Sequence, residues 1–368
     1  MNLHGRGILF GLLIAMAALA AIASRVLADD DREFNEPGNN LIADQFNNRV
    51  IEVDPSGKIV WQFGLGPSDF SPASIIGTND AQRVGELTLM AGTGTPGGQP
   101  EAPDCCNPAG CPDNRVLLVN RAGHIVWQYG QFGPGGNGPD QLNTPVQNTW
   151  LPREDEREAG IPHGHVLITD QGNGRIIEVR VSDKRIVWEY DGLNNPNCAE
   201  LLKNGHILIC DENNNQALEV THTTPSTIVH TYTTAGGMLF SGVAFASRLR
   251  NGHTLITDSN NNRIVETDEA GGVFFQYFTN TDTNSTQRST GPLPTRALRL
   301  RNGNTLISDQ YNHRVIEVSP DLQIVRSFGK IASLGYNTKS VADGGLNSPY
   351  DAKRIGDYTG ITPPFDHD

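Results

Sequence analysis

A short segment recurs five times along this chain of 368 residues, and it constrains the fold more than any other feature. The copies are NNLIADQFNNRVIEVD from Asn39, HVLITDQGNGRIIEVR from His165, HILICDENNNQALEVT from His206, HTLITDSNNNRIVETD from His253 and NTLISDQYNHRVIEVS from Asn304. A degraded sixth copy, ELTLMAGTG followed later by NRVLLVNRAGHIVWQYG, lies between the first and the second. Repetition at such a period indicates an array of similar units.

Each unit predicts four short antiparallel strands. Apolar pairs at period two, such as Leu306-Ile307, are followed by a β-branched and aromatic run such as KIVWQF from Lys58, with turn residues between them. Asn-Gly pairs such as Asn251-Gly252 join two apolar runs and are the strongest short hairpin signal. We therefore expect a further strand before each copy. Four such strands per unit form the blade of a β-propeller.

The positions of the repeated aspartate of the motif indicate the number of blades. It stands at positions 44, 170, 211, 258 and 309, and the last three intervals are 41, 47 and 51 residues. These intervals fit one blade each, while the longer first interval holds two units, so we predict an all-β, six-bladed propeller. The segment LNSPYDAKRIG from Leu346 has the pattern of an innermost strand, which the first copy lacks. We expect this C-terminal strand to complete the N-terminal blade and to close the ring without exposed edges.

The N-terminus has the form of a secretory signal peptide over residues 1–28. His4 and Arg6 precede an apolar run at 8–23, and Val26-Leu27-Ala28 is a suitable cleavage site. We therefore expect export to the periplasm or the extracellular space, with one propeller domain at 29–368. An uncleaved membrane anchor is the alternative, although the run is at the short end for a membrane span.

The charge of the chain disfavours nucleic acid as a partner. After loss of Arg6 and Arg25 with the signal segment, 26 basic and 41 acidic residues remain, a formal net charge of −15. A chain this acidic is repelled by phosphate backbones. Its carboxylates are available for calcium, the cofactor we consider.

Export allows the five cysteines to form disulfides, and the odd count leaves at least one of them unpaired. Cys111 has two local candidates, Cys105 and Cys106, and we take Cys106–Cys111 as the expected disulfide. Cys198 and Cys210 flank the Asn-Gly turn of their unit. A two-residue turn would place their thiols on opposite faces of the hairpin, so we expect no disulfide between them.

The motif DxxNxR followed by V/I-I-E-V, with FG-rich linkers and an L-N-x-P segment, resembles the NHL-repeat six-bladed propellers over nearly all of the mature chain. The phrases NGHTLITD and GKIVWQFG are also similar to the repeats of bacterial arylsulfotransferase-like propellers. The resemblance implies the fold. It leaves the activity open, because this architecture hosts binding modules, lyases, lactonases and sulfotransferases.

Residues that recur in nearly every blade are expected to be structural. The Asp and Asn of the motif suit turns, and the Arg suits a nearby acid. Trp61, Trp127 and Trp188 occupy one repeated position and are expected to pack between blades. Most histidines lie at hairpin turns, although a metal site with three histidines from separate blades is an open alternative.

The innermost strands differ between blades, and such differences are what a site needs. Alignment by their Pro or Asn-Gly landmarks gives one candidate ligand-binding position per blade: Asp80, Gln147, Cys198, Phe245, Arg296 and Asp351. The carboxylates of Asp80 and Asp351, with Gln147 beside them, would suit Ca²⁺. The alternative interpretation is that each aspartate caps its own strand.

Two insertions, at about 92–113 and 152–164, lengthen turns of the second and third blades. Long loops on a rigid ring often carry recognition, and a disulfide would hold the first one. We therefore predict a binding or interaction module for a protein, a glycan or a small ligand at one face. The alternative is an enzyme that uses the ring centre, either arylsulfotransferase-like, which needs a histidine there, or a calcium-dependent hydrolase or lyase. A purely structural role in a surface assembly is a third possibility.

Overall fold

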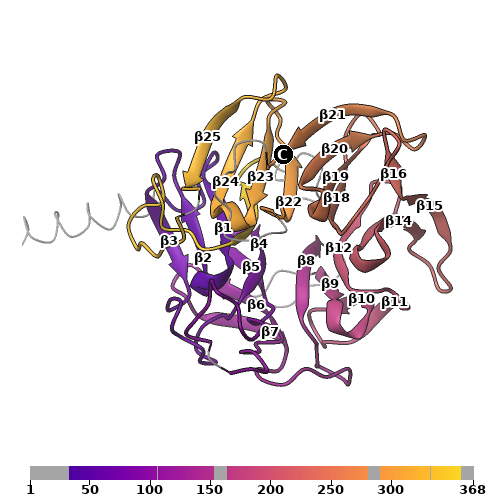
Figure 1. Cartoon of the computed structure of the whole chain (residues 1–368). Coiled ribbons are helices and arrows are strands. Elements are labelled where there is room, and N and C mark those ends of the chain that lie inside the picture. The colour runs from indigo at the N-terminus through magenta and orange to yellow at the C-terminus, as the bar shows by residue number, and fades with distance from the viewer. Residues whose placement is uncertain (1–32, 106, 153–163, 281–290, 332, 358–368) are drawn as a thin grey trace, which may run out of the picture.

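The repeated units fold into six four-stranded antiparallel sheets arranged in a ring (Figure 1). The computed structural model describes residues 33–105, 107–152, 164–280, 291–331 and 333–357. The regular elements in these ranges are strands and short 3-10 turns, which confirms the all-β six-bladed propeller. No helix in these ranges is long and apolar enough to span a membrane. The predicted signal peptide lies outside the described residues.

Blades 1 to 3 follow the chain from its N-terminal side. Blade 1 contains β26 (Pro349–Arg354), β1 (Asn40–Asp44), β2 (Arg49–Val53) and β3 (Ile59–Phe63) from the inside outward. Blade 2 contains β4 (Thr78–Val84), β5 (Leu87–Gly92), β6 (Arg115–Asn120) and β7 (Ile125–Gly130). Blade 3 contains β8 (Pro145–Pro152), β9 (Gly164–Asp170), β10 (Arg175–Arg180) and β11 (Ile186–Tyr190).

Blades 4 to 6 complete the ring. Blade 4 contains β12 (Pro196–Leu201), β13 (His206–Asp211), β14 (Gln216–Thr221) and β15 (Ile228–Tyr232). Blade 5 contains β18 (Val243–Arg248), β19 (Thr254–Asp258), β20 (Arg263–Thr267) and β21 (Val273–Phe278), and blade 6 contains β22 (Arg296–Arg299), β23 (Thr305–Asp309), β24 (Arg314–Val318) and β25 (Ile324–Gly329). A small hairpin of β16 (Thr234–Ala235) and β17 (Met238–Leu239) precedes blade 5.

The C-terminal strand closes the ring as expected. β26 pairs antiparallel with β1, from Asn40 opposite Arg354 to Asp44 opposite Pro349. The first blade is thus built from both ends of the described chain. Closure of this kind pairs strands that would otherwise leave a sheet edge exposed.

The Asp–Asn–Arg motif forms a tight turn between the second and third strands of blades 1, 3, 5 and 6, and blade 4 forms the same turn with Gln216 in place of the Arg. These turns are η1 (Gln45–Asn47), η2 (Gln171–Asn173), η3 (Glu212–Asn214), η4 (Ser259–Asn261) and η5 (Gln310–Asn312). In the first, Asp44 Oδ2 accepts hydrogen bonds from Asn47 Nδ2 and Arg49 Nε, both at 2.8 Å. The structural interpretation of the motif is therefore confirmed. We call the side of the ring that carries these turns the η face, and the opposite side the hairpin face.

Ion pairs between neighbouring blades fasten the ring together. The repeated glutamate of one blade binds an arginine from the innermost strand of the next blade in four places: Glu52–Arg83 at 2.5 Å, Glu219–Arg248 at 2.6 Å, Glu266–Arg299 at 2.9 Å and Glu317–Arg354 at 2.7 Å. The histidines at the repeated hairpin position bind glutamates of the same set, as His206 does to Glu219 at 2.7 Å. These histidines therefore serve the blade interfaces on the hairpin face.

The three tryptophans also lie between blades, as predicted. Each indole donates its N–H to a backbone carbonyl of the next blade: Trp61 to Arg121 at 2.9 Å, Trp127 to Val181 at 3.0 Å and Trp188 to Thr223 at 3.2 Å. The indole rings are at most 8% exposed. Their repetition reflects blade packing rather than a ligand-binding cage.

The two disulfides differ from the sequence predictions. Cys111 pairs with Cys105, not with Cys106, which lies outside the described residues. Cys198 pairs with Cys210, although we expected their thiols to point apart.

The reason for the second error is the length of the turn. Leu202 N donates to His206 O, so the loop contains three residues and ends at Gly205, which has a positive φ of 81°. The extra loop residue shifts the pairing by one, which places Cys198 directly opposite Cys210 with their side chains on the same face.

Ending the chain after Gly345 should abolish cooperative folding. The truncation removes β26, so Arg296 loses Asp351, Asp80 loses Lys353 and Glu317 loses Arg354. Breaking one buried ion pair typically costs about 3–5 kcal/mol, against a total stability of about 5–15 kcal/mol. Urea unfolding followed by tryptophan fluorescence measures the effect.

The matched control for the truncation is Arg354→Gln, which removes a single pair between blades. This variant should keep one cooperative transition at a lower urea midpoint. A truncated chain that unfolds at the wild-type midpoint would contradict closure by β26.

Candidate functional site

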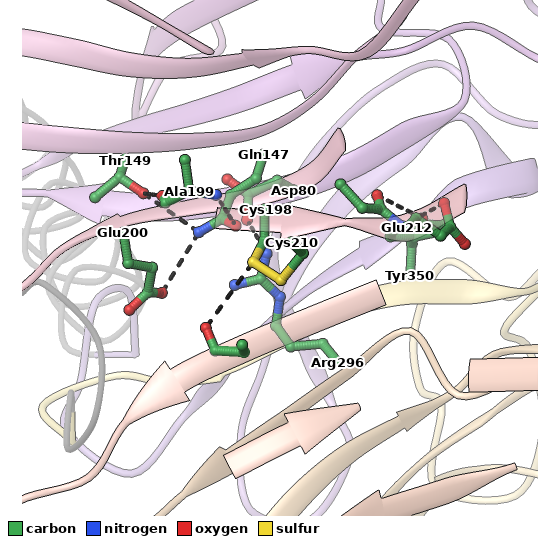
Figure 2. Close-up of a disulfide and its surroundings, with 12 residues drawn as sticks. Asp80, Gln147, Thr149, Cys198, Ala199, Glu200, Cys210, Glu212, Arg296 and Tyr350 are labelled. Carbon is green, nitrogen blue, oxygen red and sulfur yellow. Dashed lines mark hydrogen bonds and ion pairs between the residues drawn. A yellow bond between two sulfur atoms is a disulfide. The ribbon is translucent and has the colours of Figure 1, made fainter. Parts of the chain in front are cut away.

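The six aligned positions of the innermost strands come together at the centre of the ring. Each of these residues is at most 4% exposed: Asp80, Gln147, Cys198, Phe245, Arg296 and Asp351. We call them the central layer, and Figure 2 shows four of them beside the Cys198–Cys210 disulfide. The landmark alignment therefore selected one structural level of the propeller.

The central layer satisfies the free inner edges of the blades. An innermost strand has no partner on its axial side, so some of its N–H groups need other acceptors. Ala81 N donates to Asp351 at 3.1 Å, and Asn148 N donates to Asp80 at 3.2 Å. Ala199 N donates in the same way to Gln147 at 3.2 Å. Each side chain thus caps the strand of the next blade, whereas the sequence suggested that an aspartate would cap its own.

Two basic side chains neutralise the two aspartates. Arg296 lies 2.9 Å from Asp80 and 2.7 Å from Asp351. Lys353 Nζ lies 2.6 Å from Asp80 and 2.5 Å from Asp351. The four groups come from blades 1, 2 and 6 and carry no net charge together. They form a buried ion-pair network in which every charge has an opposite charge as its partner.

This network leaves the calcium hypothesis without support from the geometry. A calcium ion between the aspartates would have to displace both Lys353 and Arg296 from their oxygens. Across the described ranges, no group of three or more His, Cys, Asp or Glu side chains could hold a metal ion. Although burial opposes ionisation of both aspartates, the cations hold the pKa of Asp351 below its usual value, while burial raises that of Asp80.

Glu200 is a central carboxyl group that sequence reasoning missed. It follows Cys198 by two residues on β12, is 3% exposed and accepts one hydrogen bond, from Gln147 Nε2 at 3.4 Å (Figure 2). Burial raises its pKa to about 8, against the attraction of Arg296 and Lys353, so it is mostly protonated at neutral pH. The sequence did contain a signal for Glu200. Residues two apart on a strand point to the same face, so Glu200 shares a face with Cys198, just as Lys353 shares one with Asp351.

Three polar atoms around Asp80 are buried and have no hydrogen-bond partner within the described part of the chain. They are Asn79 Oδ1, Asn148 Oδ1 and Arg296 Nη1. Arg296 and Asn148 both bind Asp80, and Asn79 precedes it in β4. Among the same described residues, Asp351 Oδ1 also lacks a hydrogen bond, although it lies 2.7 Å from Arg296 Nε in an ion pair. One donor and two amide acceptors are therefore left in the centre of the ring without either kind of partner. Such atoms are uncommon in folded proteins and call for a water, an ion or a ligand.

A second level of residues, three of them polar, lies on the η-face side of the central layer. The pairing of four innermost strands skips one residue just before the central-layer position: Asn79, Asn197, Ala244 and Tyr350. Such bulges leave a residue outside the ladder and redirect its side chain. Tyr350 Oη donates to Asn197 Oδ1 at 3.0 Å. These two residues belong to blades 1 and 4, so this bond spans the ring.

Glu212 of η3 continues this second level. Its Oε2 accepts hydrogen bonds from Asn195 Nδ2 at 2.8 Å and Asn197 Nδ2 at 3.1 Å. Burial raises the pKa of Glu212 to about 7, opposed by the hydrogen bond from Asn195. The disulfide joins the strands that carry these groups, since Cys198 follows Asn197 and Cys210 lies two residues before Glu212.

The first insertion lies on the η face, next to the start of β26. The Cys105–Cys111 disulfide holds it, and Glu101, which is 2% exposed, accepts a hydrogen bond from Asn347 Nδ2 at 2.7 Å. The insertion thus contacts the blade that contributes Tyr350. Most of the second insertion, between Pro152 and Gly164, is outside the described residues.

Comparison with known proteins supports the fold alone. No protein-family model and no curated protein matches this chain. A solved protein of unknown function from Bacteroides caccae is similar in structure, with 13% identity and a TM-score of 0.51, over 81% of this chain and 97% of that one. A streptogramin B lyase structure shares 14% identity with a TM-score of 0.47, over 79% of this chain and 78% of that chain. These structures are β-propellers, and the NHL resemblance stays a prediction.

Removing the central disulfide should loosen the site as well as the fold. Cys198→Ala with Cys210→Ala opens a link between residues 12 apart, which is expected to cost about 3 kcal/mol. The pKa of Glu200 should fall toward its usual value as water reaches it, and carbon NMR of the glutamate carboxyl measures this. Cys105→Ala with Cys111→Ala is the control, and it should lower stability without changing this pKa. An unchanged Glu200 pKa in the first variant would contradict the positioning role.

Glu200 should make the protein less stable as the pH rises. Its pKa is about 8 when folded and near 4.5 when unfolded, so between these values the unfolded chain binds fewer protons. Its contribution is therefore fully present below pH 4.5 and is lost up to pH 8, at no more than about 1.4 kcal/mol per pH unit. Glu200→Gln should remove this decline.

Denaturant unfolding of Glu200→Gln and wild type across pH 5 to 8 isolates the effect, because other titrating groups are common to both proteins. The exposed Glu36→Gln serves as the control and should follow the wild-type curve. Parallel curves for wild type and Glu200→Gln would show that the folded pKa is normal.

Proposed function

We propose that the mature chain is an exported binding propeller that holds a polar ligand at the centre of the ring. The observation that carries this proposal is the set of three unpaired polar atoms around Asp80, namely Asn79 Oδ1, Asn148 Oδ1 and Arg296 Nη1. A network that served stability alone would gain from pairing them. Each unpaired buried polar group costs about 1–3 kcal/mol, which a bound partner would recover.

The η face is the side from which we expect the ligand to approach. Tyr350 and Asn197 bridge the ring there, and the disulfide-held insertion lies beside them. Replacing one hydrogen bond between these side chains is a small cost for a ligand that brings its own polar groups. The ligand is therefore a small polar molecule, or a polar end of a protein or glycan that reaches past Tyr350.

Two disulfides accord with an oxidising compartment, which supports export to the periplasm or the extracellular space. A ring fastened by ion pairs and disulfides is a rigid frame for such a site. Rigid frames bind without a large cost for ordering the site.

The enzymatic alternative has one feature in its favour. Glu200 is mostly protonated near neutral pH, and a perturbed carboxyl in a buried site is a candidate general acid. Its hydrogen bond is with Gln147, which transfers no proton. The described histidines of the repeated position bind glutamates at the blade interfaces, so they do not support a sulfotransferase nucleophile in the centre. Binding is therefore the function we favour.

Asn79→Ala should weaken ligand binding while leaving the fold intact. The substitution removes a buried acceptor that has no partner, so the melting temperature should change by only a few degrees. Loss of one hydrogen bond to the ligand should reduce affinity about tenfold. A screen of polar metabolites and oligosaccharides by thermal shift, followed by titration calorimetry of the hits, supplies the measurement.

Asn260→Ala, an exposed asparagine of η4 on the same face, is the matched control and should bind every hit as wild type does. Hits that bind wild type and Asn79→Ala equally would place the ligand elsewhere. A screen without hits would count against a binding function in the ring centre.

A further inference from the structure

We propose that the ring centre recognises a carboxylate, which accepts hydrogen bonds from Arg296 Nη1 and from protonated Glu200, and that its binding is coupled to the protonation of Glu200. This inference rests on the proposed binding function and specifies its ligand. Glu200 and Arg296 belong to β12 of blade 4 and β22 of blade 6. Figure 2 shows both side chains beside the central disulfide.

Arg296 provides a donor that is held in one orientation. Its Nη2 and Nε bind Asp80 and Asp351, and its guanidinium lies 4.1 Å from the centre of the Phe245 ring. The side chain is 5% exposed, so Nη1 cannot turn toward solvent without breaking these contacts. A fixed guanidinium N–H is well suited to bind a carboxylate oxygen.

Glu200 provides the second donor when it carries its proton. Its one hydrogen bond goes to Gln147, and no ion pair joins it to Arg296 within the described part of the chain, although the charge of Arg296 opposes the rise in its pKa. A carboxylate in contact with both groups would accept a hydrogen bond from each.

The charges around this position decide when an anion is accepted. The charged groups that act on Glu200 are Arg296, Lys353 and Asp80, which shares both cations with Asp351, and Gln147 is the neutral group bonded to it. Their charges sum to zero, so the centre is neutral with Glu200 protonated and carries −1 without the proton. An incoming carboxylate therefore meets a neutral site below the Glu200 pKa and a like charge above it.

The remaining free atoms indicate what accompanies the carboxylate. Asn79 Oδ1 and Asn148 Oδ1 are acceptors and require an O–H or N–H on the ligand. The ligand class is therefore a small carboxylic acid, or a terminal carboxylate of a larger molecule, with a hydrogen-bond donor close to the carboxylate. Glycolate is the simplest probe of this class, and glycolamide is its neutral counterpart.

Titration calorimetry with glycolate at pH 6.5 and 9.5, in buffers without chloride or carboxylates, tests the inference. With the Glu200 pKa at about 8, affinity for wild type should fall about 30-fold between the two values. At pH 9.5, buffers of different ionisation enthalpy should report close to one proton taken up per glycolate bound. Glycolamide should bind more weakly than glycolate at pH 6.5.

The variant Glu200→Gln keeps a donor and cannot ionise, so its affinity for glycolate should differ less than threefold between the two pH values, without proton uptake. Equal binding of glycolate by wild type at both pH values would overturn the coupling to Glu200. Binding of glycolamide without binding of glycolate would overturn the carboxylate assignment while leaving the binding function in place. Failure of both probes to bind would also overturn the inference, and the ligand screen with Asn79→Ala then decides on the binding function separately.

Discussion

The inner edges of the blades impose the constraint on which this structure depends. Each innermost strand has N–H groups that face the ring axis and lack a neighbouring strand. The chain meets this requirement by capping Ala81, Asn148 and Ala199 with side chains of the preceding blade. The acceptors must be polar and buried, so a propeller of this kind cannot have a purely apolar centre.

Polarity at a buried centre creates a second requirement, since aspartates that accept these bonds need compensating charge. Arg296 and Lys353 supply it, and they reach Asp80 and Asp351 from different blades. Every charge of this network has an opposite charge as its partner, but some of its polar atoms have no hydrogen-bond partner among the described residues. The residual capacity of Arg296, together with the weakly bonded Glu200, underlies the proposed binding site.

Repetition made the fold predictable, because the period, the turn motif and the unmatched strand from Leu346 each point to a closed ring of six blades. The same alignment predicted the residues of the central layer. It could not predict their partners, since Arg296 and Lys353 meet Asp80 only through the geometry of the closed ring. The Cys198–Cys210 disulfide was missed because one additional loop residue reverses which side chains share a face.

The most direct test of the account is a high-resolution crystal structure of the mature protein grown with glycolate at pH 6.5. We predict a bound carboxylate with its oxygens at hydrogen-bond distance, about 2.6–3.1 Å, from Arg296 Nη1 and the Glu200 carboxyl group. The ligand hydroxyl should approach Asn79 or Asn148. A direct Arg296–Glu200 bond that leaves no room between them, or water alone at this position, would contradict it.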